Sequence, residues 1–130
     1  MIDRLLNQSA AGTLERMASF HAKRQGVLVE NGVNLSTPGY RQKDLDVAGY
    51  QAELRERLDR RDAAGTADLS GLEVGAAATK ARLVFHDGND RDVEQLMGEQ
   101  AKNALQHNLA VELLRKQYGL FQMALRERVA

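Results

Sequence analysis

The chain has no cysteine and no tryptophan, a single proline, and only 5% aromatic residues among its 130 residues. The absence of cysteine excludes disulfides, thiolate chemistry and cysteine-ligated zinc. The shortage of aromatic residues leaves few large side chains for a core, so we expect much of the apolar surface to lie on helix faces. No run approaches the roughly 20 apolar residues of a membrane span, and the first eight residues lack the apolar core of a signal peptide. We therefore expect a chain that neither spans a membrane nor uses the general secretory route.

Charge and motif content argue against several functional classes. The 18 basic and 18 acidic residues cancel and are interspersed, whereas a dedicated nucleic-acid binder needs a basic field. No nucleophile–base pair, glycine-rich phosphate loop or paired-carboxylate motif stands out, so we predict no catalytic or cofactor site. The acidic run 87–92 fails the calcium-loop pattern because Asp92 stands where that loop requires glycine. We predict a turn followed by a helix cap there, and no metal site.

An amphipathic helix is predicted near the start of the chain, from about residue 13 to 33, because apolar residues recur there at steps of three and four. Gly26 and Gly32 lie inside it, and each costs about 1 kcal/mol relative to alanine in a helix. This helix should therefore depend on a packing partner. The residues expected to pack are Met17, Phe20, Val27 and Leu28.

A second, longer helix is predicted from about residue 89 to the end of the chain, with acidic residues at its start and Arg126 and Arg128 near its end. A seam with alternating steps of three and four runs along it, which is coiled-coil spacing. The seam residues expected to pack are Val93, Met97, Ala104, Val111, Leu114, Tyr118, Phe121 and Leu125. Further leucines widen the apolar surface beyond one stripe. We predict that one face meets the first helix as an antiparallel pair and that another meets neighbouring subunits.

The first helix should end sharply at the only proline. Pro38 has no N–H and disfavours the helical conformation at Thr37. Gly39 then stands where a type II turn needs a positive φ. Tyr40 follows the turn as an anchor that can bury its ring and keep its hydroxyl bonded.

The insert between the two helices, about residues 35–88, is the least determined part of the sequence. A short charged helix is predicted at about 50–61 and a minor strand at 81–86. Residues 63–78 are rich in alanine, glycine and threonine, with few side chains able to anchor a core, so we predict a flexible loop. The predicted fold is thus mainly α. Terminal helices at about 1–34 and 89–130 pair as a hairpin or coiled coil, and an irregular insert carries a short helix and a minor β element.

Several sequence runs resemble the bacterial flagellar basal-body rod proteins. Asn-Gly-Val-Asn-Leu-Ser-Thr-Pro-Gly-Tyr at 31–40 is similar to their rod signature, in which Asn-Ile-Ala-Asn is followed two residues later by Thr-Pro-Gly-Tyr. Runs at 24–28 and 43–46, and short runs beginning at Asp87, Asp92 and Asn103, resemble the FlgB branch of that family. Residues of about 50–81 carry no match, and Gly32-Val33 stands where the family has Ile-Ala.

The resemblance implies a single rod-type domain spanning 1–130 and a non-catalytic subunit of the proximal rod, which transmits torque from the membrane ring to the distal rod. Terminal helices would pack into a helical tube, with Asn103 among the packing residues. Implied partners are copies of the chain, the rod proteins FlgC and FlgF, the FliE adaptor and the FliF ring. Export would use the flagellar type III apparatus, and the location would be the periplasmic part of the basal body. The turn residues expected to fix a loop or a subunit interface are Asn31, Asn34, Thr37, Pro38, Gly39 and Tyr40.

The same amphipathic helices also fit a different class of protein. A small helical adaptor or chaperone-like binding module would use them to hold a helix of another protein. Such a module should form a defined small oligomer or heterodimer in solution, whereas a rod subunit should add to a helical array.

Overall fold

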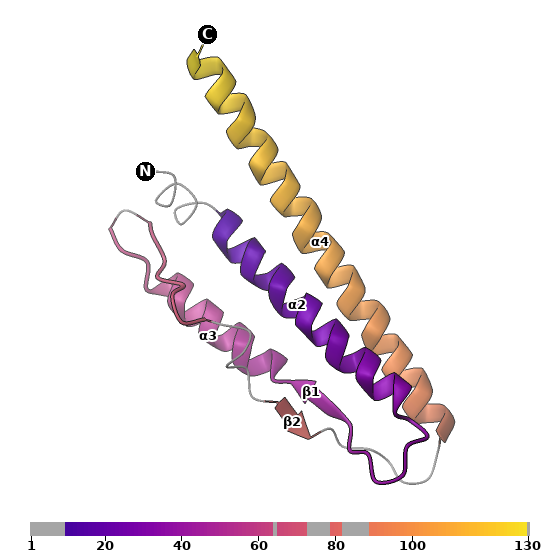
Figure 1. Ribbon diagram of the computed structural model, residues 1–130. Coiled ribbons are helices and arrows are strands. Elements are labelled where there is room, and N and C mark those ends of the chain that lie inside the picture. Colours follow the sequence, from indigo (N-terminus) through magenta and orange to yellow (C-terminus); the bar gives the residue numbers. More distant parts are fainter. Residues whose placement is uncertain (1–9, 64, 73–78, 82–88, 130) are drawn as a thin grey trace.

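The computed structural model describes residues 10–63, 65–72, 79–81 and 89–129. In chain order, its elements are α2 (Ala10–Val33), β1 (Lys43–Leu45), α3 (Val47–Asp59), β2 (Thr79–Ala81) and α4 (Asn89–Val129). Helices α2 and α4 lie side by side and run in opposite directions, and α3 lies along another side of α2 (Figure 1). The predicted mainly helical fold, with paired terminal helices and a small β element, is confirmed.

The register of the α2–α4 pair is fixed by polar side chains of α4 that reach backbone groups of α2. Gln100 Nε2 donates to the Leu28 carbonyl oxygen at 3.0 Å, and His107 Nδ1 donates to that of Ala18 at 3.0 Å. Leu28 thus lies level with Gln100, and Ala18 lies level with His107. Ala10 therefore lies level with about residues 115–118 of α4, and the remaining turns of α4 extend past the described part of α2 (Figure 1).

A tight turn follows α2 at the proline. The Tyr40 N–H donates to the Thr37 carbonyl oxygen at 3.2 Å, which closes a four-residue turn. Gly39 has a φ of 75°, the positive value that the third position of a type II turn requires, and Pro38 occupies the second position. The positive φ expected at Gly39 is therefore present, and the chain turns away from α2 here.

The insert begins with β1, which pairs antiparallel with β2 so that Asp44 lies opposite Lys80. Helix α3 starts three residues before the predicted helix. Its N-cap is Asp46, whose carboxylate accepts the Gly49 N–H at 3.1 Å. The strand predicted at 81–86 coincides with β2 only at Ala81, and residues 82–88, which include the predicted Asp-Gly turn, lie outside the described residues.

The main apolar cluster lies between α2, β1, α3 and the segment 65–72, and a smaller set of buried apolar residues, Leu28, Leu96 and Ala110 among them, belongs to α2 and α4. The buried residues of the main cluster are Phe20, Leu45, Tyr50, Leu54, Ala67, Leu69 and Leu72. Three of these belong to the segment predicted to have few core anchors, so that prediction is wrong for the described residues of 63–78. The backbone of this segment is held by the guanidinium of Arg57, which donates to the carbonyl oxygens of Asp68 and Ser70.

Tyr50 contributes its ring to this core, and its hydroxyl finds no hydrogen-bond partner in the part of the chain that the structure describes. The ring stacks on Phe20, with centroids 4.1 Å apart and planes 15° apart. Tyr50 is 6% exposed, burial raises the pKa of its hydroxyl, and that hydroxyl has no hydrogen-bond partner among the described residues. The stacking therefore stabilises the core, while the hydroxyl carries a desolvation cost.

Replacing this tyrosine tests that cost directly. Tyr50→Phe should raise the free energy of unfolding by about 1 kcal/mol, because it removes a buried, unbonded hydroxyl and keeps the stacked ring. Urea unfolding followed by circular dichroism measures the change. Tyr40→Phe is the matched control, since the Tyr40 hydroxyl is bonded to Asn31 and its removal should destabilise the chain. A clear loss of stability in Tyr50→Phe would contradict the assignment of its hydroxyl as unbonded.

Candidate functional site

Asn31, in the last turns of α2, joins the helix to the chain that follows the turn. Its side chain is fully buried, with 0% exposure. Its Nδ2 donates to the Lys43 carbonyl oxygen at 2.5 Å, and its Oδ1 accepts the Lys43 N–H at 3.0 Å. A neighbouring strand would bond β1 through the same two backbone groups, so Asn31 occupies the place of a strand partner. The Tyr40 hydroxyl donates to the same Oδ1 at 3.2 Å.

The second motif asparagine, Asn34, has a different and more exposed role. Its Nδ2 donates to the Glu30 carbonyl oxygen at 2.9 Å, and its Oδ1 accepts the Thr37 hydroxyl at 3.1 Å. The Thr37 N–H donates to the Asn34 carbonyl oxygen at 3.0 Å. Asn34 thus satisfies backbone groups at the end of α2 and shapes the start of the turn, as C-terminal capping residues do.

Arg24 ties α2, β1 and α4 together. Its Nε and Nη2 donate to the two carboxylate oxygens of Asp44 at 3.0 and 2.9 Å, and Nη2 lies 3.6 Å from a carboxylate oxygen of Glu99. The residue is 9% exposed, and the hydrogen bonds to Asp44 raise the pKa of Arg24 against the opposing effect of burial. Two parallel hydrogen bonds to one carboxylate suit the planar guanidinium, and they fix the orientation of β1 relative to α2.

Asn103 is the buried centre of the contact between α2 and α4, with 0% exposure. Its Nδ2 donates to the His21 carbonyl oxygen and to Gln25 Oε1, both at 2.8 Å. Its Oδ1 therefore accepts the hydrogen bond from His21 Nδ1, also at 2.8 Å. With the Gln100 and His107 bonds, these contacts give the α2–α4 contact a row of polar interactions beside buried apolar residues such as Leu28 and Leu96. We call this row of polar interactions the polar seam.

The predicted packing residues fall into two environments. Phe20, Leu28 and Asn103 are buried, and Met17, Val27, Val93, Ala104, Val111, Leu114 and Phe121 are partly buried. Three others on α4 are exposed, namely Met97 at 64%, Tyr118 at 40% and Leu125 at 62%. The packing role of these three is thus not met within the described chain and stays a prediction about neighbours.

The buried residues of α4 each directly precede a residue of the predicted seam. Leu96, Asn103 and Ala110, each seven residues apart, are the buried residues, whereas the predicted seam passes through Met97, Ala104 and Val111. At the central position the difference arises because hydropathy favours Ala104 over Asn103. Hydrogen bonds, not apolar character, bury Asn103.

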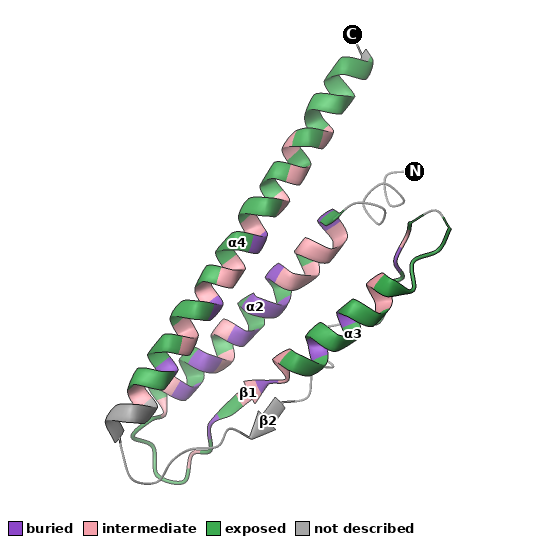
Figure 2. Ribbon diagram, turned by 180° about the vertical axis from the view of Figure 1, so that it is seen from behind, coloured by how far each residue is buried: buried purple, intermediate pink, exposed green. Residues whose placement is uncertain are grey.

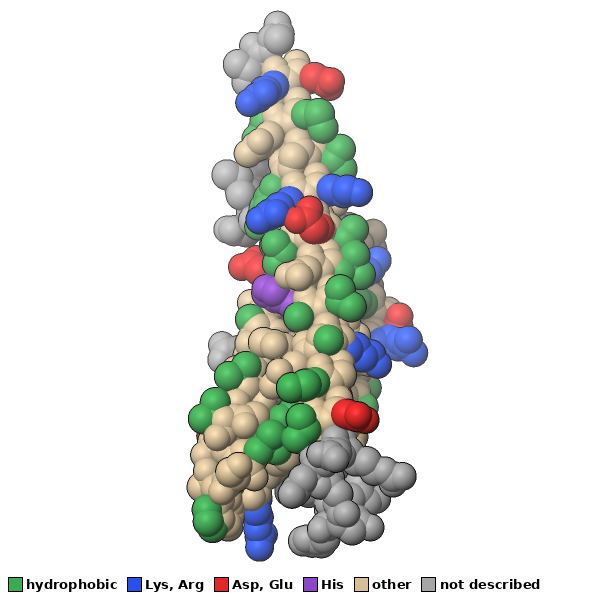
Figure 3. Space-filling view, turned by 90° about the vertical axis from the view of Figure 1, so that its right-hand side faces the viewer, with side chains coloured by type: hydrophobic (Ala, Val, Ile, Leu, Met, Phe, Trp, Pro, Cys, Tyr) green, Lys and Arg blue, Asp and Glu red, His purple; other side chains and the backbone are tan. Residues whose placement is uncertain are grey.

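The outer surface of α4 remains rich in exposed apolar side chains. Figure 3 views the molecule from the side on which α4 lies in Figure 1, and hydrophobic side chains extend along much of that surface. Neither 103–111 nor 117–125 contains an aspartate, glutamate, lysine or arginine. The exposed large apolar residues of α4 are Met97, Leu105, Leu109, Leu113, Tyr118, Leu120, Met123 and Leu125.

Residues 118–125 of α4 carry exposed apolar side chains on opposite sides of the helix. Tyr118, Leu120, Met123 and Leu125 are 40–62% exposed, and their spacing points them in different directions around the helix. Figure 2 shows most of this part as exposed. Apolar side chains on opposite sides of a helix are characteristic of a buried environment. This part of α4 is therefore built for contacts that the described chain does not supply.

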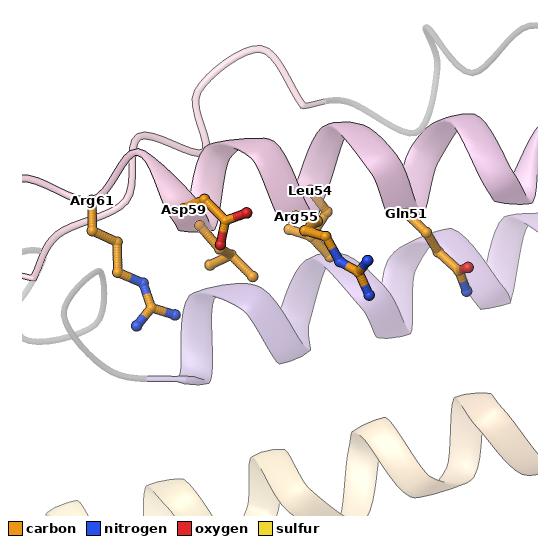
Figure 4. Close-up of a pocket in the computed structure, with 6 residues that line it drawn as sticks. Gln51, Leu54, Arg55, Asp59 and Arg61 are labelled. Carbon is orange, nitrogen blue, oxygen red and sulfur yellow. The ribbon is translucent and has the colours of Figure 1, made fainter.

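The hollow beside α3 lacks the features of a chemical site. It has a volume of about 370 Å³ and is lined by Gln51, Leu54, Arg55, Leu58, Asp59 and Arg61. Figure 4 shows the labelled polar side chains extending to the same side of α3, with two arginines around one aspartate. In the described ranges, no three histidine, aspartate or glutamate residues are grouped to hold a metal ion. Of the helices in those ranges, none is both long and apolar enough to cross a membrane.

Comparison with known proteins places the chain in a family. No model of a known protein family matches it. It is 30% identical over 128 aligned residues to the flagellar basal body rod protein FlgB of Escherichia coli (strain K12), with 88% of this chain and 89% of the relative covered. The flagellar basal body rod protein FlgB of Shigella flexneri is similar to the same extent. The chain belongs to the flagellar basal body rod protein family.

Proposed function

We propose that the chain is an FlgB-type structural subunit of the proximal rod of the bacterial flagellum, which packs its terminal helices with those of neighbouring copies into a helical tube. The similarity to FlgB over most of both chains supports a structural role in the basal-body rod. The observation that carries the proposal is the exposed apolar surface of α4, which a lone subunit would leave in water. Leaving such a surface in water is costly, and burial between subunits removes that cost.

The shape of the chain suits a shaft that carries torque. Long helices packed along the axis resist sliding through many small contacts, each weak alone and large in sum. The junction of Arg24, Asn31 and Asp44 would hold the insert to the helices while force passes along α4. Each subunit would then transmit torque from the membrane ring towards the distal rod as one body.

The family resemblance supplies the proposed partners and location. These partners are copies of the chain, the rod proteins FlgC and FlgF, the FliE adaptor and the FliF ring. The chain would reach the periplasmic rod through the flagellar type III apparatus. The turn residues Thr37 to Tyr40 would set the direction in which each subunit leaves the helical layer.

A test should remove the assembly surface and leave the fold intact. Leu120→Asp and Met123→Asp place charge on exposed apolar positions of α4, so the chain should be made and keep its helicity. We expect swimming to be lost and the chain to be missing from purified basal bodies, because a buried unpaired carboxylate opposes assembly. Ala52→Asp, on the exposed and already charged face of α3, is the matched control and should swim.

Normal swimming in both α4 variants would contradict the proposal. So would the absence of the wild-type chain from basal bodies. A defined small oligomer or heterodimer in solution, together with that absence, would instead favour the helical adaptor.

A further inference from the structure

We propose that the two ends of the helix pair are complementary, so that the C-terminal end of α4 in one copy docks on the turn end of α2 and α4 in the next. This inference rests on the proposed function and deepens it by naming the surfaces that meet. The partner is a second copy of the chain. The two surfaces are defined below as the overhang and the turn-end patch.

The turn-end patch consists of Val29, Val33 and Met97, which are 47%, 77% and 64% exposed. Val29 and Val33 lie one turn apart on α2. Met97 lies beside them, because Gly32 faces α4, where a Cβ built on it would come within 3.7 Å of Leu96. Gly32 and Leu96 face each other across the antiparallel pair. The next residue on each helix, Val33 on α2 and Met97 on α4, therefore lies on the same side of the pair. The three side chains thus form one apolar surface across both helices.

The turn-end patch is bordered by acidic residues. Glu30 follows Val29 on α2, and Glu94 precedes Met97 by one turn on α4. Both glutamates are exposed. An apolar surface with an acidic edge suits a partner that is apolar and basic.

The overhang, residues 118–128 of α4, has that chemistry. Residues 117–125 carry no lysine, arginine, aspartate or glutamate, and Tyr118, Leu120, Met123 and Leu125 are exposed. Arg126 and Arg128 stand in the last turn. Glu127 lies between the two arginines, so the overhang presents apolar side chains followed by a segment with a net charge of +1, which complements the turn-end patch in both respects.

These two surfaces can meet only between copies. Met97 and Leu125 are 28 residues apart on one continuous helix, which corresponds to about 42 Å. Contact between unlike surfaces at opposite ends of a molecule joins copies head to tail, and such contacts build open helical assemblies when they do not close into a ring. Apolar burial would supply most of the affinity, and the charges would select the partner end.

The absence of cysteine makes this contact directly testable by crosslinking. A chain carrying Val33→Cys and Leu125→Cys replaces the wild-type chain in cells, and basal bodies are treated with a short bismaleimide. The two positions are too far apart to bridge within one chain, so a ladder of covalent multimers is expected. Either single variant should give dimers at most. Gln51→Cys with Leu125→Cys, which pairs the overhang with the exposed face of α3, is the matched control and should give no ladder.

A charge swap gives an independent test that does not depend on new cysteines. Arg126→Glu with Arg128→Glu should reduce incorporation into basal bodies, because acidic residues would then face Glu30 and Glu94. Adding Glu30→Arg and Glu94→Arg to the same chain should restore incorporation.

The outcomes separate this inference from the proposed function. If the chain is present in basal bodies but neither the ladder nor the rescue appears, the head-to-tail contact is wrong and the rod assignment stands. If the wild-type chain is absent from basal bodies, the proposed function fails and this inference fails with it. A ladder from the 33–125 pair alone, with rescue by the charge swap, supports the contact.

Discussion

Replacing Asn31 by alanine should lower the free energy of unfolding by about 3 kcal/mol, because it removes three hydrogen bonds worth about 1 kcal/mol each. The three bonds join Asn31 to the two backbone groups of Lys43 and to the hydroxyl of Tyr40. The side chain has no exposure, so water does not simply replace it. Loss of these bonds should also free β1 from α2. The amide proton of Lys43 should therefore exchange faster with solvent, which hydrogen exchange can measure beside urea unfolding.

Asn34→Ala is the matched control, since it changes the same residue type within the same motif. Asn34 is partly exposed, and among the described residues its side chain bonds only Glu30 and Thr37. We expect a cost of about 1 kcal/mol or less and unchanged exchange at Lys43. Equal losses for the two variants would show that Asn31 does not join the insert to the helix.

Local signals in the sequence were sufficient for the helices and the turn. The spacing of apolar residues predicted the two terminal helices, because helical periodicity appears within any few turns. The positive φ of Gly39 followed from its place after Pro38, since glycine adopts that conformation without strain. Such features depend on neighbours in the chain and not on the rest of the fold.

The contacts that hold the insert to α2 could not be predicted from the spacing of residues along the sequence. The pairing of Arg24 with Asp44 and of Asn31 with Lys43 joins residues that only the folded chain brings together. All four residues stand in runs shared with rod proteins, so the resemblance marked them without explaining them. The anchoring of Leu69 and Leu72 was missed for the same reason, because composition does not reveal what a segment packs against.

Helix α2 presents two unlike faces, and this division explains the placement of the core. Phe20, Met17 and Val27 face the insert and contribute to its apolar core. His21 and Gln25 face α4 and contribute to the polar seam. Apolar contacts between long helices tolerate sliding by a turn or a heptad, whereas a buried amide must meet its partners. The polar seam therefore fixes the register of the pair, and with it the length of α4 that extends past α2.

Asn103→Ala tests this role of the polar seam and should lower the free energy of unfolding by about 3 kcal/mol. The change leaves a small cavity at a position with no exposure, and it leaves His21 Nδ1 and Gln25 Oε1 without their partner. Urea unfolding of the full chain measures the loss. Asn108→Ala, one turn later on the exposed surface of α4, is the matched control and should change stability by about 0.5 kcal/mol at most.

A double variant separates stability from register. His21→Leu with Asn103→Leu removes both partners of the central bond, so much of the lost stability should return. A slip of seven residues would then bring position 103 level with Leu28 or Leu14, which now costs less than in the wild-type chain because only the bonds of Gln100 and His107 are broken. Distances between spin labels on α2 and α4 should therefore show one register in the wild-type chain and more than one in the double variant. A single unchanged register in the double variant would mean that the bonds of Asn103 are not needed to align the two helices, because the bonds of Gln100 and His107 remain in that variant.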